Sequence, residues 1–263
     1  LYFHLGVAKA LWREDLLPNI MSGSSGGALV GSIICASSDE ELDELLDPNA
    51  LPALDDPSGL VSRVFSILKT ERITADDIWQ VLEEFVPDCT FEEALRRTGR
   101  HMNIPVAPAE NHQKSRLLNA DTSPNVFMRE AVLASTAIPG FFPSVVLMAR
   151  NDRGERQAYH SSRKWVDGSL SEDLPAKRLA RLYGVNHYIV SQTNPHVVPF
   201  LNDESEEKGL LPFIQDVVIK GPMVQLEHFL EVVHRHFELP GLGSVIKKAH
   251  AMARQTYSGD ITI

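Results

Sequence analysis

Apolar residues in this chain recur at two different spacings, and the two spacings alternate along its length. Helical spacing predicts a buried helix at 1–12 and another helix at 126–135. Short apolar runs predict strands at 102–107 and at 185–192, and the second is the most convincing buried strand. Further helices are expected at 28–36, 39–46, 75–86, 91–98 and 174–183, and further strands at 116–120 and 164–166. Because strands alternate with helices, we expect an α/β fold with three layers (α/β/α) and a central, mostly parallel sheet.

Polar residues just before several of these helices carry capping signals. Ser38 precedes an acidic helix. Thr74 and Thr90 each stand three residues before an acidic residue, which is the spacing of a capping box. Asn125 is the expected cap of the helix that follows it. These signals predict where the helices begin.

The pattern turns helical over 203–250, near the end of the chain. A stripe of apolar residues recurs there at helical spacing, opposite charged residues. Its members are Leu226, Phe229, Leu230, Val233 and Phe237. The segment is expected either to close the core or to act as a lid or lipid-facing helix beside an apolar pocket. We expect the chain to form one domain over 1–263.

A glycine-serine turn lies between a short apolar strand and a small-residue helix. Gly23, Ser25 and Gly27 form the pattern G-x-S-x-G, which is typical of a sharp strand-to-helix turn with serine at its apex. Such a turn is expected to leave no room for a Cβ atom on either side of the serine, and glycine meets that need. The helix that follows would point its N-terminal amides at a forming oxyanion. A turn that only packs the helix on the sheet, or that cradles a phosphate, is the alternative.

Charge and composition narrow the classes of function. The formal net charge of −10 argues against a nucleic-acid partner, because phosphates need cationic contacts. Cys35 and Cys89 are too few for a disulfide framework, and Cys35 is expected to be a buried thiol. No run of roughly 18 apolar residues predicts a transmembrane helix, and no signal peptide is visible. Because the chain starts inside a predicted helix, we expect natural residues upstream of Leu1, where targeting signals can lie.

A serine nucleophile needs a general base, and the usual one is histidine. None of the ten histidines lies in a sequence pattern that marks it as a catalytic base. His196 follows the strand predicted at 185–192, whereas His187 lies inside it. Asp167 is the stronger candidate, because a predicted strand ends there and Gly168 allows a tight approach. A partly desolvated carboxylate held against a serine hydroxyl can take its proton without a histidine.

Several motifs that occur in order along the chain resemble one family. They are Gly23-x-Ser25-x-Gly27, Ser135-x-Ala137-x-Pro139-x-x-Phe142 and Asp167-Gly168. Together they resemble the patatin-like acyl hydrolases, which use a Ser–Asp dyad in place of a triad. Longer stretches look like the branch that includes fungal and plant triacylglycerol lipases; these stretches are 115–119, 166–175, 185–196 and 257–263. The resemblance covers nearly the whole chain.

The resemblance implies a patatin-like fold and a single catalytic domain. It implies that Ser25 is the nucleophile and Asp167 the general base of a serine acyl-ester hydrolase of the lipase or phospholipase A type. The expected substrate is a lipid ester, with triacylglycerol among the candidates, and no metal or organic cofactor is implied. We expect peripheral contact with a membrane or lipid-droplet surface and a cytoplasmic or peripheral membrane location. No nucleic-acid partner is expected, and the oligomeric state stays open.

The oxyanion donors are only partly accounted for by this sequence. In the family a glycine-rich oxyanion loop lies just before the helix that begins here at about Leu1, so the sequence lacks it. On the geometry of the turn, the amide of Gly26 is the one donor that we can name. The other glycines at motif positions are Gly23, Gly27 and Gly168.

Two other functions stay open. One is a Ser–His–Asp hydrolase with His187 or His196 as the base. The other is a lipid-binding domain that kept the fold and lost the chemistry along with the glycine-rich loop. In the family, the region that corresponds to Asn194-Pro195 adjoins the site. A loop whose shape is fixed by the proline explains this pair at least as well as contact with the substrate does.

Overall fold

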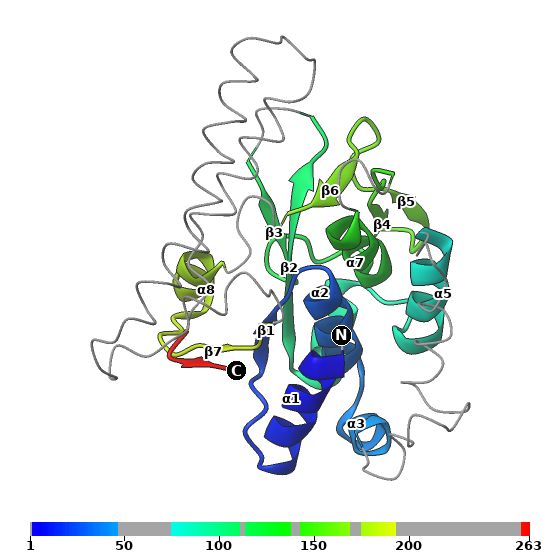
Figure 1. The fold of residues 1–263 in the computed structure, drawn as a ribbon. Helices are drawn as coiled ribbons and strands as arrows, with labels where there is room; N and C mark the ends of the chain where they lie inside the picture. The colour runs from blue at the N-terminus through cyan, green and yellow to red at the C-terminus, as the bar shows by residue number, and fades with distance from the viewer. Residues whose placement is uncertain (1, 47–74, 111–113, 138–142, 169–174, 193–258) are drawn as a thin grey trace, which may run out of the picture. The chain divides into compact units, whose positions relative to one another are not determined.

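The computed structural model describes residues 2–46, 75–110, 114–137, 143–168, 175–192 and 259–263 (Figure 1). They divide into two compact units, Leu1–Leu179 and Ala180–Ile263. The first unit contains α1 (Tyr2–Arg13), β1 (Ile20–Ser22), α2 (Gly26–Ala36), α3 (Asp39–Leu45), α5 (Ala75–Phe85), α6 (Phe91–Thr98), β2 (His101–Pro108), β3 (Arg116–Leu118), α7 (Met128–Thr136), β4 (Met148–Arg150), β5 (Arg156–Ala158) and β6 (Trp165–Asp167). Helix α8 (Ala176–Tyr183) follows, and then β7 (Ile189–Val190) and β8 (Ile261–Thr262). The expected single domain stays a prediction.

Strand β2 is the centre of a four-stranded sheet. β1 runs parallel to it, with Met21 opposite Met102. β3 and β6 are both antiparallel to β2. The described sheet is therefore mixed, and the expected predominance of parallel pairs is not seen in it. For β2 and β3 the reason is the short connection at 109–115, since a parallel pair needs a crossover of roughly a dozen residues or more.

β1 and β6 lie along the same edge of β2. Val106 pairs with both β3 and β6, so these two strands flank it on opposite edges. Backbone polar groups of alternate strand residues point to the same edge. The carbonyl of Asn103 accepts the amide of Gly23, just after β1. The amide of Ala109 donates to the carbonyl of Lys164, just before β6, and therefore at the same edge. The C-terminal ends of β1 and β6 consequently approach each other from opposite directions.

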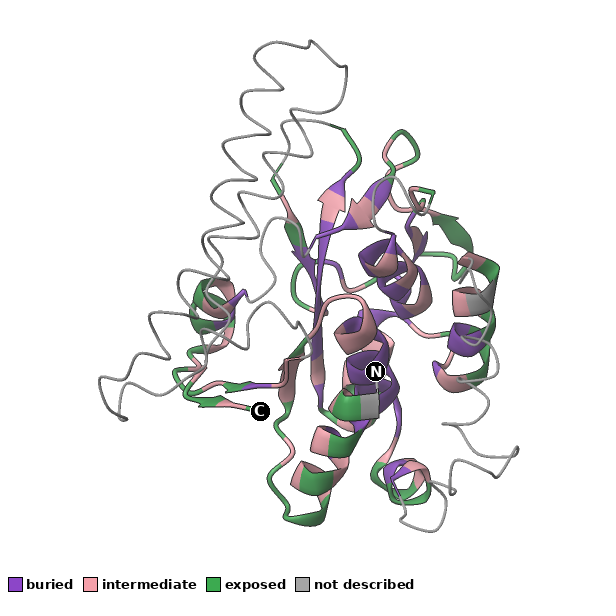
Figure 2. Ribbon diagram, viewed as in Figure 1, coloured by how far each residue is buried: buried purple, intermediate pink, exposed green. Residues whose placement is uncertain are grey.

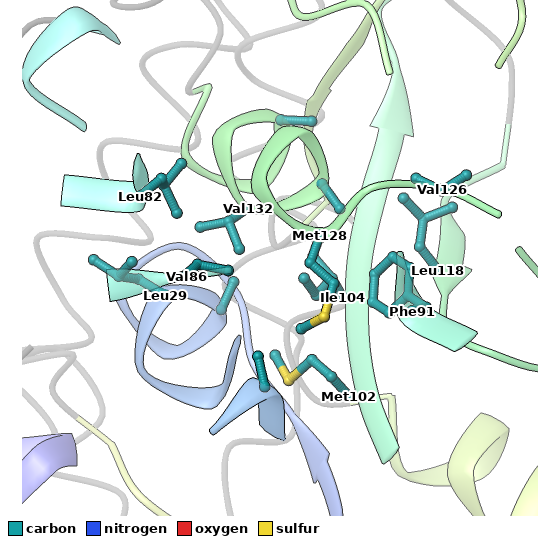
Figure 3. Packing of buried hydrophobic residues seen from close by; sticks show 14 of the residues in the cluster. Leu29, Leu82, Val86, Phe91, Met102, Ile104, Leu118, Val126, Met128 and Val132 are labelled. Atoms are coloured by element: carbon teal, nitrogen blue, oxygen red, sulfur yellow. The ribbon is translucent and has the colours of Figure 1, made fainter. Parts of the chain in front are cut away.

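The hydrophobic core lies between β2 and helices α2, α5, α6 and α7. Met102, Ile104 and Val106 are buried and share one face of β2, because residues two apart on a strand point the same way. Figure 3 shows Met102 and Ile104 reaching toward the helices, where Leu29 of α2 and Met128 of α7 belong to the same cluster. β2 is buried along most of its length (Figure 2). Full burial of one such side chain stabilises the fold by about 1.5–3 kcal/mol.

Helix α1 packs on α2 through one face. Leu5 and Ala8 are buried and form a second cluster with Val30 and Ile34 of α2. The helix predicted at 1–12 is therefore confirmed, but the prediction that it is buried is wrong, because among its described residues only Leu5 and Ala8 are buried and Phe3 is exposed. None of the helices that the structure describes is long and apolar enough to cross a membrane.

Capping boxes open two helices where the sequence predicts them. At α3 the hydroxyl of Ser38 accepts the amide of Glu41, and the Glu41 carboxylate accepts the amide of Ser38. Thr90 and Glu93 make the same exchange at α6. Thr74 lies outside the described residues.

The prediction that Asn125 caps α7 is wrong. The helix begins at Met128, and Phe127 occupies the N-cap position. Val126 and Phe127 take part in isolated antiparallel bridges to other segments. Because extended pairing engages these two residues, the helix begins only after them.

The segment 185–192 forms a much shorter strand than expected. In the second unit β7 pairs in parallel with β8, with Ile189 opposite Ile261. Ile189 and His187 are exposed, whereas Val190 is buried, so the strand alternates and is not buried on both faces. The prediction of a fully buried strand is therefore wrong. The predicted helical segment at 203–250 lies outside the described residues.

Candidate active site

Ser25 stands at the apex of a strained turn between β1 and α2. Its backbone has φ 51° and ψ −116°, and it occupies the N-cap position of α2. Among the described residues Asp15 is the other non-glycine residue with positive φ. A conformation of this kind costs about 1–3 kcal/mol and persists where the surrounding structure enforces it. The predicted strand-to-helix turn is confirmed, and Ser25 is partly exposed on it.

The two outer glycines of the turn, Gly23 and Gly27, differ in whether a side chain would fit in their place. A Cβ atom on Gly23 would lie 2.3 Å from the carbonyl carbon and oxygen of Gly27, so no side chain fits there. A Cβ atom on Gly27 would have nothing within 4 Å. The expectation that both sides of the serine need glycine for space is thus confirmed at Gly23 and wrong at Gly27. The turn closes by bringing the start of α2 back over Gly23.

Ser135, near the end of α7, links this turn to the central strand. Its hydroxyl accepts a hydrogen bond from the Ser25 amide at 3.2 Å. The same hydroxyl donates to the carbonyl of Pro105 in β2, also at 3.2 Å, and Ser135 is fully buried. One hydroxyl thus joins the turn, α7 and β2. The conformation of Ser25 is supported by packed elements on two sides.

Pro105 occupies a central strand, which is unusual because proline has no N–H to donate to a neighbouring strand. By strand alternation its backbone points to the same edge as that of Asn103. At that edge β1 pairs up to Asn103 and β6 begins its pairing at Val106, so Pro105 falls in the gap. Because no described strand pairs with Pro105 at this edge, the missing N–H removes no hydrogen bond between strands. The carbonyl of Pro105 accepts a hydrogen bond from the Ser135 hydroxyl instead.

Asp167 ends β6 directly beside this gap. It lies opposite Val106 of β2, and its amide donates to the carbonyl of Ala137 at 3.0 Å. The residue is only 3% exposed. A Cβ atom on Gly168 would lie 2.6 Å from backbone atoms of Pro105 and Val106. Glycine is therefore required at this position, where the residue after β6 lies against the backbone of β2. The tight approach expected at Gly168 is confirmed.

Ser25 and Asp167 are therefore borne by two strand ends that converge on Pro105. β1 leads into the Ser25 turn from one side, and the Gly23 amide donates to Asn103 at 3.1 Å. β6 arrives from the other side with Asp167 opposite Val106. The geometry brings a strained serine and a buried carboxylate to one edge of one strand.

A buried amide pair stiffens the strand that leads into the turn. The Asn103 side chain donates to the Met21 carbonyl of β1 at 3.0 Å and accepts from the Asn119 side chain at 2.8 Å. The Asn119 oxygen in turn accepts the amides of Asp121 and Thr122. Both asparagines are fully buried, so these bonds also satisfy polar groups that water does not reach.

Gly26 is the first residue of α2 and follows Ser25. Its amide has no hydrogen-bond acceptor within the described part of the chain, whereas the Gly27 amide donates to the Ser24 carbonyl at 2.9 Å. An unsatisfied amide at the positive end of a helix is suited to bind a developing negative charge. The Ser25 amide is already engaged by Ser135.

The helix that bears Ser135 is anchored by charged groups. Glu130 of α7 is buried and forms an ion pair with Arg156, which also contacts Asp88 at 2.6 Å. The Arg156 guanidinium lies 3.9 Å from the centroid of the buried Phe127 ring. Burial raises the pKa of Glu130, although Arg156 opposes this effect.

A small cavity of about 210 Å³ lies at the C-terminal end of α7. It is lined mainly by apolar side chains, and Ala137 among them is the residue whose carbonyl accepts the Asp167 amide. The full lining is Ala75, Leu133, Thr136, Ala137, Pro143, Ser144 and Val145. The cavity thus adjoins the candidate site.

The two histidines named as alternative bases both fall beyond the first unit in the sequence. His187 is exposed beside β7 in the second unit, and His196 and Asn194-Pro195 lie outside the described residues. Sequence reasoning named Ser135 only within a family motif and assigned no role to Pro105 or Asn103. A proline inside an otherwise regular strand pattern was the available signal for a local gap in strand pairing.

Comparison with known proteins places this geometry in a family context. The family model described as patatin-like phospholipase matches residues 1–180. Triacylglycerol lipase 4 of Saccharomyces cerevisiae is 36% identical over 99% of this chain and 31% of its own length. Triacylglycerol lipase SDP1L of Arabidopsis thaliana is 34% identical over 99% of this chain and 34% of its own length.

A patatin-like phospholipase domain-containing protein of Chaetomium globosum is 40% identical over 74% of this chain and 23% of its own length. The chain spans about a third or less of the length of these relatives. Two of these relatives are named triacylglycerol lipases, and the family description names a phospholipase. The chain belongs to the patatin-like phospholipase family.

Proposed function

We propose that this protein hydrolyses lipid esters with Ser25 as nucleophile and Asp167 as general base. The observation that carries the proposal is the convergence of the Ser25 turn and Asp167 on the gap at Pro105. The strained backbone of Ser25 supports it, because strain of this kind gathers at functional sites. The burial of Asp167 also supports it, since partial desolvation makes a carboxylate a better proton acceptor.

The reaction proceeds through an acyl-enzyme. Asp167 takes the proton of the Ser25 hydroxyl while the serine oxygen attacks the ester carbonyl. The tetrahedral oxyanion is stabilised by the Gly26 amide and by the N-terminus of α2. Collapse of this intermediate expels the alcohol, which takes the proton from Asp167. Water then attacks the acyl-enzyme, Asp167 accepts its proton, and the fatty acid leaves as Ser25 regains a proton.

The substrate class is a long-chain lipid ester, with triacylglycerol the first candidate. Two of the relatives are named triacylglycerol lipases, and the family description names phospholipase. The apolar lining of the cavity beside Ala137 is compatible with part of an acyl chain. Such substrates lie in membranes or lipid droplets, so the protein works in peripheral contact with a lipid surface, and its fold is the three-layer α/β/α arrangement of the family.

Covalent labelling tests the proposed nucleophile. The full-length protein is treated with a fluorophosphonate ester, and the modified residue is mapped by mass spectrometry. We expect the label on Ser25 and its loss in Ser25→Ala. In Asp167→Asn we expect labelling and ester hydrolysis to slow by at least about 10²-fold, the range for loss of a general base. An unlabelled Ser25 in folded protein rejects the proposal.

A neighbouring serine provides the matched control. The Ser24 hydroxyl is buried and has no hydrogen-bond partner among the described residues. Ser24→Ala should therefore keep normal labelling one residue away from the nucleophile. His187→Ala and His196→Ala separate the dyad from a histidine triad, because the dyad predicts that neither mimics Asp167→Asn.

A further inference from the structure

Basic residues occupy the two segments that flank the end of the sheet near Asp167. They are Lys114, Arg116, Arg163 and Lys164, and they are called the basic rim below. Arg116 of β3 and Asp167 of β6 lie opposite the same residue, Val106. Neighbouring strands are ~4.8 Å apart, so the backbones of Arg116 and Asp167 are separated by roughly 10 Å. The basic rim therefore adjoins the proposed catalytic edge.

The rim is formed by two segments that flank the end of β2. Lys164 comes just before β6, and its carbonyl accepts the Ala109 amide at 2.8 Å. The Arg116 guanidinium lies over the Trp165 ring, 5.7 Å from its centroid. Arg116 and Arg163 both help to lower the pKa of His160, after burial as the main cause, which indicates that both cations lie near its ring.

The positive charge of the rim is not compensated. Within the described residues none of the four cations forms an ion pair, whereas other arginines do. Those paired arginines are Arg96, Arg97, Arg100, Arg150 and Arg156. The rim segments 106–116 and 160–167 contain two acidic residues, Glu110 and Asp167, against the four cations. In a chain of net charge −10, such a local excess of positive charge marks a surface for an anionic partner.

An exposed apolar side chain borders the basic rim. Val145 and Trp165 exchange backbone hydrogen bonds as an antiparallel bridge, which sets Val146 opposite Lys164. Val146 is 37% exposed. Basic groups beside exposed apolar groups are typical of surfaces that lie on anionic lipid, because the cations meet headgroups while the apolar groups enter the interface.

We propose that the basic rim docks on the headgroups of an anionic phospholipid surface. The docking brings the edge that holds Ser25 and Asp167 against the lipid from which the ester substrate is drawn. The role of this docking in supplying substrate rests on the proposed function, but the binding to lipid itself requires no ester hydrolysis. The overall negative charge makes this orientation selective, since the rest of the protein is repelled by the same surface.

Vesicle binding of the full-length protein tests the inference. A Ser25→Ala background prevents lipid turnover, and co-sedimentation compares phosphatidylcholine vesicles with vesicles that also contain phosphatidylserine. We expect tighter binding to the anionic vesicles, weakened by added salt. Arg116→Gln with Lys164→Gln should lower the partition coefficient by roughly 25-fold, about fivefold for each cation removed. Thermal melting checks that the variant is folded.

A charge-matched control removes two exposed arginines elsewhere, Arg13 and Arg153. Arg13→Gln with Arg153→Gln should bind the anionic vesicles as the parent does. Equal binding by the rim variant and this control overturns the inference, and so does equal binding of the parent to both kinds of vesicle. Hydrolysis of a water-soluble short-chain ester, measured with Ser25 intact, should be unchanged in the rim variant. A parent that binds anionic vesicles but fails on that ester rejects the catalytic proposal and leaves the rim in place.

Discussion

The Ser135 hydroxyl accepts the Ser25 amide across a separation of 110 residues along the chain. Because the same hydroxyl donates to Pro105, α7 holds the turn and β2 at a fixed distance from each other. Asp167 is tied to the same helix end, since its amide donates to the Ala137 carbonyl. The end of α7 thus supports both residues of the proposed dyad.

Ser135→Ala should lower both the activity and the stability of the protein. The variant leaves the Ser25 amide without its acceptor and the Pro105 carbonyl without its donor, which costs about 1–3 kcal/mol in the buried state. The turn then loses its support, and a displaced nucleophile lowers the rate by up to about 10²-fold. We expect kcat for a soluble ester to fall about 10- to 100-fold with KM little changed. An unchanged kcat in a variant with reduced stability would assign Ser135 a purely structural role.

Gly23→Ala and Gly27→Ala should have opposite outcomes although both lie in the same motif. The added methyl at Gly23 meets the Gly27 carbonyl at 2.3 Å, so the turn must open. The methyl at Gly27 meets nothing within 4 Å and falls in the first turn of α2, where alanine is a good helix former. We expect Gly23→Ala to lose fluorophosphonate labelling and Gly27→Ala to keep it. Similar labelling rates in the two variants would contradict this account of the turn.

The Ser25 turn was predictable from sequence because its requirements are local. A short apolar strand, a glycine two residues before the serine and a small-residue helix all lie within Ile20 to Ala36. The capping boxes at Ser38 and Thr90 were predictable for the same reason, since each joins residues three apart. The candidate Asp167 followed from an Asp-Gly pair at a predicted strand end.

The contacts that organise the site were not predictable in this way. Ser135 reaches Pro105 over 30 positions and Ser25 over 110, and no local pattern encodes such a pairing. The edge of β2 that β6 meets is likewise set by residues far apart in the sequence, since Val106 pairs with Asp167. The burial of 185–192 was not predictable either, because apolar content alone does not tell whether both faces of a strand are covered.

Both cysteine thiols should resist alkylation in the folded protein. Burial raises the pKa of Cys35 to about 12, and burial followed by the charge of Glu93 raises that of Cys89 to about 11. The thiolate is the reactive form, so at pH 8 only a minute fraction of either residue can react. Iodoacetamide at pH 8 should label neither cysteine until denaturant is added. Rapid labelling of Cys35 in native protein would contradict its complete burial.

Gly168→Ala should disable the site through the position of Asp167. The new methyl would stand 2.6 Å from the backbone of Pro105 and Val106, atoms that are held in the central strand. The end of β6 must therefore move away from β2, which costs about 1–3 kcal/mol of stability for an overpacked site. Since Asp167 precedes this glycine, its carboxylate moves as well, and we expect ester hydrolysis to fall about 10²-fold.

The control for Gly168→Ala is Gly6→Ala in α1, where an added methyl has nothing within 4 Å. Gly6→Ala should stabilise the protein by about 0.5–1 kcal/mol, because alanine loses less conformational entropy in a helix, and should leave hydrolysis unchanged. Urea unfolding and hydrolysis of a soluble ester measure both effects in each variant. If Gly168→Ala retained parental hydrolysis, the contact between β6 and Pro105 would not control the proposed base.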